Sequence, residues 1–161
     1  MKFTHPLKSN QIYRAPWHDY HSRCIYMITM LKRMETPPFA YVEGMGLKFT
    51  PLGREIQKQI IHFSELESRI RILQYVVMPD HIHILLFVTE PIPETLGQYI
   101  ARWKIKVNKA CGFESIFEIG FNDQILHMSR SLKVLVNYIR DNPRRLRLGG
   151  RFRIISGGWM S

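Results

Sequence analysis

Residues 71–88 read RILQYVVMPDHIHILLFV, two apolar runs joined by Pro79 and Asp80. Each run is eight residues long and rich in branched aliphatic side chains, a composition typical of buried strands. The intervening pair is too short for anything but a turn or a bend. The stretch therefore predicts two adjacent strands, or one long bent strand pair, with both faces buried.

The segments upstream predict one strand and one helix. Cys24–Leu31 (CIYMITML) is rich in branched and aromatic residues, which favours a first strand. Residues 33–49 are expected to form a loop, with a short hairpin around Tyr41–Phe49. Thr50 can cap a helix and Pro51 suits its first turn. Apolar residues then follow at helical spacing, at Leu52, Ile56, Ile60 and Phe63.

The segments downstream predict two helices and a short strand. Thr95–Ala110 carries an apolar stripe, a short strand is expected at Ile116–Ile119, and a turn at Gly120. A third helix is expected at Ser131–Asp141, ended by Pro143, because proline cannot continue the hydrogen bonding. The order of elements predicts a two-layer α+β domain, in which helices pack on an antiparallel sheet.

Length and composition indicate one globular domain over residues 1–161. The chain has 19.1 kDa, 45% apolar residues and 22% charged residues, which excludes disorder for most of it. It holds 23 Lys and Arg against 13 Asp and Glu, a net charge of +10, so a partner that carries phosphates is favoured. The two isolated cysteines exclude a disulfide framework or a CxxC metal site. No apolar run reaches the length of a membrane span, and we expect a cytoplasmic protein with no membrane partner.

His81 and His83 form the densest chemical signal. Side chains alternate along a strand, so both imidazoles project from the same face. Two neutral imidazoles at this spacing can supply two ligands to a divalent metal. From spacing alone, the pattern is more typical of half-buried histidines bonded to backbone groups.

Tyr138 and Asn142 form a second candidate pair. They lie four residues apart, on one side of the predicted third helix, so an amide oxygen could reach a metal beside the phenol. Such a tyrosine is more often a packing residue, and the spacing alone is common.

Together these motifs resemble a known family. The segments MPDHIH at 78–83, GFNDQIL at 120–126 and YIRDNPRRL at 138–146 are similar to those of REP-associated tyrosine transposases, a branch of the single-tyrosine HUH transposases related to the IS200 type. RAPWHDYHSRCIYMIT at 14–29 and FTPLGREI at 49–56 extend the resemblance, which covers roughly residues 14–145. It implies a ferredoxin-like HUH endonuclease fold.

The resemblance implies a nuclease and strand transferase that acts on single-stranded DNA at REP-like hairpins. His81 and His83 would bind Mg²⁺ or Mn²⁺, and Tyr138 would attack the scissile phosphate to form a covalent 5′-phosphotyrosine. Asn142 matches the position of a third metal ligand. Asp123 matches an acidic position that would support the site or only cap a turn. Relatives of this kind act as homodimers.

Contacts to DNA are expected from basic and aromatic residues. The arm at residues 1–22 and its junction with the first strand, together with the second helix, offer five candidates: Arg14, Trp17, Arg23, Arg102 and Lys104. A basic helix face is equally often only solvated. Trp103, within the apolar stripe of the helix, is expected in the core.

Two departures from the family bear on function. Asp80 stands where relatives often have Asn, and the basic tail at 144–161 is shorter than is usual. Three hypotheses follow: an active transposase, a catalytically inactive or domesticated DNA-binding protein of the same fold, and a small metal-binding structural domain. The third leaves the match at 138–143 unexplained.

Overall fold

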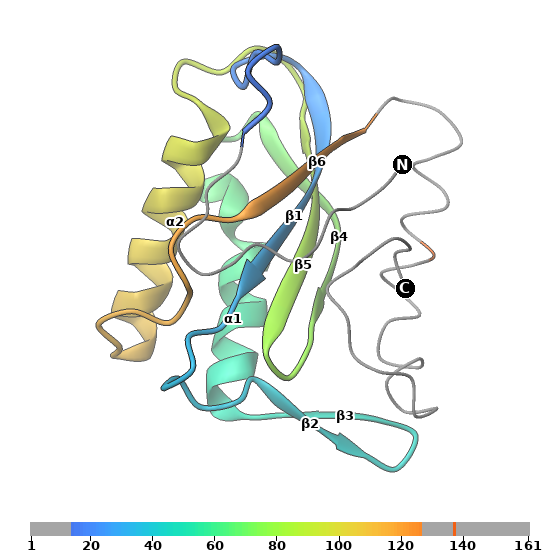
Figure 1. Ribbon diagram of the computed structural model, residues 1–161, viewed down its shortest axis with the longest axis vertical. Coiled ribbons are helices and arrows are strands. Elements are labelled where there is room, and N and C mark those ends of the chain that lie inside the picture. Colours follow the sequence, from blue (N-terminus) through green and yellow to red (C-terminus); the bar gives the residue numbers. More distant parts are fainter. Residues whose placement is uncertain (1–13, 127–136, 138–161) are drawn as a thin grey trace.

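The computed structural model describes residues 14–126 and Asn137 (Figure 1). Asn137 is helical, and it is the one described residue of the third helix predicted at Ser131–Asp141. Tyr138, Asn142 and the basic tail at 144–161 lie outside the described residues.

Nine elements follow one another along the described chain. They are β1 (Cys24–Leu31), β2 (Ala40–Glu43), β3 (Gly46–Phe49), α1 (Pro51–Ile61), the 3₁₀ helix η1 (Phe63–Glu65), β4 (Ile70–Val77), β5 (His81–Val88), α2 (Leu96–Cys111) and β6 (Asn122–Leu126).

Four of the strands form one antiparallel sheet in the order β4-β5-β1-β6. The predicted pairing of residues 71–78 with 81–88 is confirmed, because β4 and β5 are antiparallel neighbours joined by a tight turn. The backbone N–H of Met78 donates to the carbonyl of His81 at 2.8 Å and closes that turn. β2 and β3 pair separately as the predicted hairpin, which extends away from the main sheet (Figure 1).

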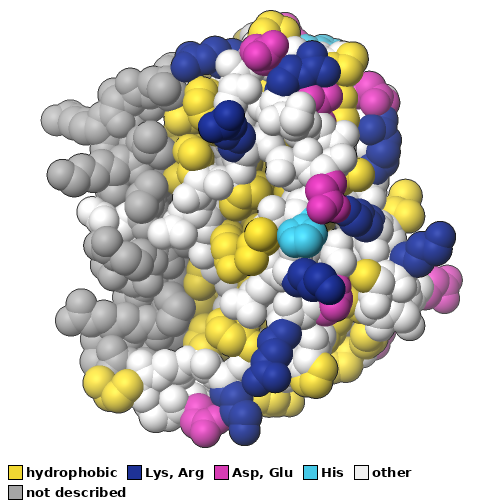
Figure 2. All heavy atoms as spheres, turned by 180° about the vertical axis from the view of Figure 1, so that it is seen from behind, with side chains coloured by type: hydrophobic (Ala, Val, Ile, Leu, Met, Phe, Trp, Pro, Cys, Tyr) yellow, Lys and Arg dark blue, Asp and Glu magenta, His cyan; other side chains and the backbone are white. Residues whose placement is uncertain are grey.

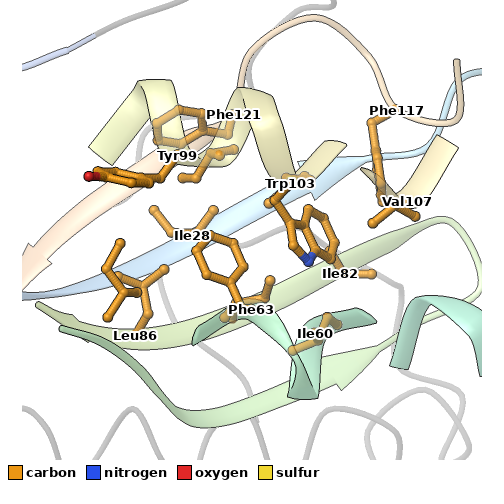
Figure 3. Close-up of a cluster of buried hydrophobic side chains, with 14 of the residues drawn as sticks. Ile28, Ile60, Phe63, Ile82, Leu86, Tyr99, Trp103, Val107, Phe117 and Phe121 are labelled. Carbon is orange, nitrogen blue, oxygen red and sulfur yellow. The ribbon is translucent and has the colours of Figure 1, made fainter. Parts of the chain in front are cut away.

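Both helices pack on the same face of the sheet, and the core lies between the two layers (Figures 1 and 3). Trp103 of α2 is fully buried there, as the apolar stripe predicts. Its ring stacks against Phe63 at 5.8 Å between centroids, and its indole N–H donates to the carbonyl of Gln59 at 2.9 Å. The two-layer α+β prediction is confirmed. Within the described part of the chain, no helix has the length and apolar character needed to cross a membrane.

Both helices begin at threonine caps, of which Thr50 was predicted and Thr95 was not. The Thr50 hydroxyl accepts a hydrogen bond from the Gly53 N–H at 3.0 Å, and Thr95 forms a capping box with Gln98. Gly53 also permits a close approach of α1 to the preceding loop. A Cβ atom at this position would lie 2.0 Å from the carbonyl oxygen of Phe39.

The short strand predicted at Ile116–Ile119 is wrong. That segment makes only an isolated bridge from Phe117 to Lys32, and the Ile116 and Phe117 side chains are buried. The edge strand is β6, after a turn with Gly120 at φ 79°. A search for apolar runs misses this strand because residues 122–124 (NDQ) are polar. Pairing with β1 nevertheless satisfies the hydrogen-bonding groups of its backbone.

Candidate metal centre and nucleic-acid surface

His81 and His83 point to the face of the sheet opposite the helices. Along β5 the alternate residues Ile82, Ile84 and Leu86 belong to the core under the helices, so the two imidazoles project the other way. Both side chains are 0% exposed. Their Nε2 atoms lie 3.0 Å apart, with the ring planes at 77° to each other. The strand thus brings the two rings together in a T-shaped arrangement.

The far nitrogen of each ring has its own partner. Nδ1 of His81 lies 3.2 Å from an oxygen of Asp80, and Nδ1 of His83 lies 2.9 Å from the hydroxyl of Thr29. Thr29 stands directly opposite His83 in the pairing of β1 with β5. Sequence reasoning missed Thr29, since 54 positions separate it from His83 and only the strand register shows that they meet.

Burial favours the neutral form of both rings. Desolvation lowers the pKa of His81, and the bond to Asp80 offsets only part of this effect. The pKa of His83 lies well below its ordinary value, first because of desolvation and then because of repulsion from His81. Neutral imidazole is the form that binds metal ions.

The two Nε2 atoms are close enough to bind one divalent cation together. Among residues 14–126 and Asn137, no group of three or more His, Cys, Asp and Glu side chains converges as a metal site.

Polar residues of β6 share this face with the histidines. Asn122 pairs with Thr29, and Gln124 with Met27, so both amides project to the histidine side of the sheet. Asn122, Thr29 and His83 stand in one row across three strands. The sequence carries no periodic signal for this row.

Asp123 lies on the opposite face. It pairs with Ile28, whose side chain belongs to the core under the helices. Its carboxylate accepts from Arg14 at 3.1 Å and from the Tyr20 hydroxyl at 2.9 Å, while the Arg14 guanidinium stacks 3.4 Å from the centre of the Phe121 ring. Burial raises the pKa of Asp123, partly offset by Arg14, and raises that of Tyr20 to about 12. The structure thus joins Asp123 to the arm and keeps it away from the histidines.

Two more DNA-binding candidates are engaged within the chain. The Lys104 ammonium donates to the carbonyls of Glu118 and Gly120, and burial lowers its pKa to about 8. Arg102 is paired with Glu94 and lies over the Tyr99 ring. A phosphate contact by either cation would have to compete with these partners.

Trp17 and Arg23 are also exposed, as Arg102 is. Trp17 is 74% exposed, and Arg23 lies 5.0 Å from the centre of the Phe87 ring. Phe87 is on the histidine face, four residues along β5 from His83. At about 3.3 Å per residue the backbone of Phe87 lies roughly 13 Å from that of His83, with the Arg23 guanidinium beside the Phe87 ring.

The surface charge is mixed on the side seen from behind in Figure 2. Lys and Arg side chains there alternate with Asp and Glu. Residues 14–126 hold 13 basic and 12 acidic residues, whereas the rest of the chain holds 10 basic residues and one acidic residue. Nearly all of the net charge of +10 therefore belongs to residues 1–13 and 127–161.

A comparison with solved structures finds a clear similarity. The chain matches the structure of a REP-associated tyrosine transposase bound to a REP hairpin, with a TM-score of 0.63 and 20% sequence identity. The match covers 84% of this chain and 74% of the other. No protein-family model matches the sequence, and no curated protein does. The antiparallel sheet with two helices on one face therefore has the fold of a REP-associated tyrosine transposase. The opposite face of this sheet carries the buried histidine pair.

Proposed function

We propose that this protein is a metal-dependent single-stranded DNA endonuclease and strand transferase that acts at REP-like hairpins. The observation that carries the proposal is the buried histidine pair on a transposase fold, with Nε2 atoms 3.0 Å apart. The structural neighbour is described as bound to a REP hairpin, which supports DNA as the partner. We place the activity in the bacterial cytoplasm.

His81 and His83 would hold Mg²⁺ or Mn²⁺, and the amide of Asn142 is the proposed third ligand. A bound divalent ion polarises a phosphate and makes it easier to attack. The imidazoles hold their position because Asp80 and Thr29 fix the far side of each ring. Asp123 would support the site only indirectly, through strand β6.

Tyr138 is the proposed nucleophile. Its phenolic oxygen would bond to the scissile phosphorus as the bond to the 3′ oxygen breaks, with the proton ending on the released 3′ hydroxyl. The 5′-phosphotyrosine keeps the energy of the phosphodiester bond, so a later 3′ hydroxyl can displace the tyrosine without ATP. In a homodimer, the tyrosine of one subunit could serve the site of the other.

DNA binding is proposed to combine the exposed arm with the basic termini. Trp17 offers an aromatic surface for a base, and Arg23 lies on the histidine face, where it can contact a phosphate. Arg14, Arg102 and Lys104 remain candidates that would first have to leave their partners.

The test is the formation of a covalent adduct. Purified full-length protein is incubated with Mn²⁺ and a labelled single strand that contains a REP-like hairpin, and the products are separated under denaturing conditions. We expect a protein–DNA adduct that is lost in Tyr138→Phe. The matched variant Tyr41→Phe should keep the adduct, since Tyr41 lies on the protein's β2–β3 hairpin and is 55% exposed.

The alternatives give different results. Hairpin binding with no adduct at any divalent ion concentration would identify a catalytically inactive or domesticated DNA-binding protein. Affinity that is absent, or that does not fall with salt, would leave only a metal-binding structural domain.

A further inference from the structure

Residues 15–18 of the arm form a tight turn that presents Trp17. The His18 N–H donates to the Ala15 carbonyl at 3.2 Å, which closes a turn of four residues. Pro16 takes the second position of this turn, where its fixed backbone angle is favoured. Trp17 comes next and is 74% exposed, with its ring in T-shaped contact with that of His18 at 5.6 Å between centroids. The turn therefore holds an indole ring at the surface.

The Asp123 carboxylate holds both flanks of this turn. Arg14, directly before the turn, donates to one carboxylate oxygen at 3.1 Å. The Tyr20 hydroxyl, two residues after the turn, donates to the other oxygen at 2.9 Å and accepts from the Ala15 N–H at 2.9 Å. The Asp123 side chain is 5% exposed, and hydrogen bonds to a carboxylate are stronger than those between neutral groups. Asp123 therefore ties both ends of the turn to strand β6.

The ring that lies beside Trp17 is held from the sheet. Nε2 of His18 lies 2.7 Å from the hydroxyl of Tyr26 in β1, and Tyr26 is fully buried. The Tyr20 ring stacks on that of Tyr26 at 5.9 Å between centroids and makes a T-shaped contact with His18 at 4.7 Å. Trp17 is thus supported by rings that are themselves fixed in the domain.

We propose that Asp123, Arg14 and Tyr20 are positioning residues that seat the arm and so present Trp17 to DNA in a preformed orientation. The partner that fits this surface is an unpaired base, because an exposed aromatic ring can stack on the face of any base. Seating the arm before binding avoids the ordering cost that a free arm would meet on binding. The inference rests on the proposed contact between Trp17 and DNA, and it makes Arg14 an anchor instead of a phosphate contact.

The seating of the arm is tested without DNA. Steady-state ¹H–¹⁵N NOE values of the full-length protein report backbone motion on the picosecond to nanosecond timescale. Residues 15–19 should be as rigid as strand β1 in the unmodified chain and mobile in Asp123→Asn and Tyr20→Phe. The matched controls are Glu67→Gln and Tyr99→Phe, because Glu67 likewise accepts from an arginine and a tyrosine hydroxyl and is 9% exposed. An arm that is mobile in the unmodified chain, or rigid in both variants, would overturn the proposal.

The effect on DNA is measured by fluorescence anisotropy with a labelled single strand that contains a REP-like hairpin. If Asp123→Asn leaves the arm seated about one tenth of the time, the affinity falls about tenfold. Glu67→Gln, which removes the same charge, should not weaken binding. Because Asp123→Asn removes a negative charge, it would strengthen a purely electrostatic contact. Tighter binding with a steeper dependence on salt would therefore overturn the proposal and make Arg14 a phosphate contact that Asp123 holds back.

A double-mutant cycle shows whether Asp123 acts through Trp17. Once Trp17→Ala has removed the exposed ring, adding Asp123→Asn should weaken binding by less than about twofold, because residues that act through one contact are not additive. A further loss in the double variant as large as that of Asp123→Asn alone would overturn the proposal. Absence of hairpin binding by the unmodified chain, together with a rigid arm, would defeat the proposed function and the role of Trp17 but not the seating of the arm by Asp123.

Discussion

Mild acid is predicted to destabilise the metal-free protein through its two buried histidines. Burial lowers the pKa of both rings in the folded state, and proximity to His81 lowers that of His83 further. In the unfolded chain the pKa of histidine is about 6.5. As the pH falls below this value, the unfolded state takes up protons that the folded state excludes, so the free energy of unfolding decreases. Above about pH 7 the pair contributes no pH dependence.

The magnitude follows from the number of protons excluded. Each proton contributes about 1.4 kcal/mol per pH unit. Two rings that stay neutral at pH 5.5 would therefore lower the free energy of unfolding by up to about 3 kcal/mol relative to pH 7.5. This is a large part of the 5–15 kcal/mol that stabilises a typical domain.

Urea unfolding in EDTA at pH 7.5, 6.5 and 5.5 measures the effect. The double variant H81N/H83N should lose most of the decrease between pH 6.5 and 5.5. The control His62→Asn should keep it, because the His62 side chain is 45% exposed. If the unmodified chain and the double variant show the same pH dependence, the rings take up protons inside the fold, and the case for them as ready neutral ligands fails.

Three further predictions concern the arm, α2 and α1. Trp17→Ala should weaken binding of the DNA hairpin by about 1–3 kcal/mol, the contribution of one stacked base. Ile119→Ala, at a residue that is also exposed, should leave the affinity unchanged, and fluorescence anisotropy measures both affinities. Lys104→Met should lower the free energy of unfolding by about 1–3 kcal/mol, because two carbonyls lose their donor, with little change in DNA affinity. A loss of affinity with unchanged stability would instead make Lys104 a phosphate contact. Gly53→Ala should lower the melting temperature, because the new Cβ would meet a backbone oxygen at 2.0 Å. Gly46→Ala should not, because the space there is open. Equal melting temperatures for the two variants would contradict this packing.

Local patterns predicted most elements of the described fold. The apolar runs predicted β1, β4 and β5, the cap at Thr50 predicted the start of α1, and the apolar stripe at Thr95–Ala110 predicted α2. The search for apolar runs failed at β6, where polar residues pair with the edge of β1. An edge strand is stabilised by backbone bonds to its neighbour, and these leave little trace in its own composition.

By itself, the sequence determined that His81 and His83 share one face of a buried strand, because alternation is a property of the extended backbone. Only the tertiary structure decided that Thr29 stands beside His83, and that Asp123 joins Arg14 on the other face, away from the histidines. Those contacts join residues more than 50 positions apart. They depend on strand register, which the packing of the whole sheet against α1 and α2 fixes and which no local stretch of sequence encodes.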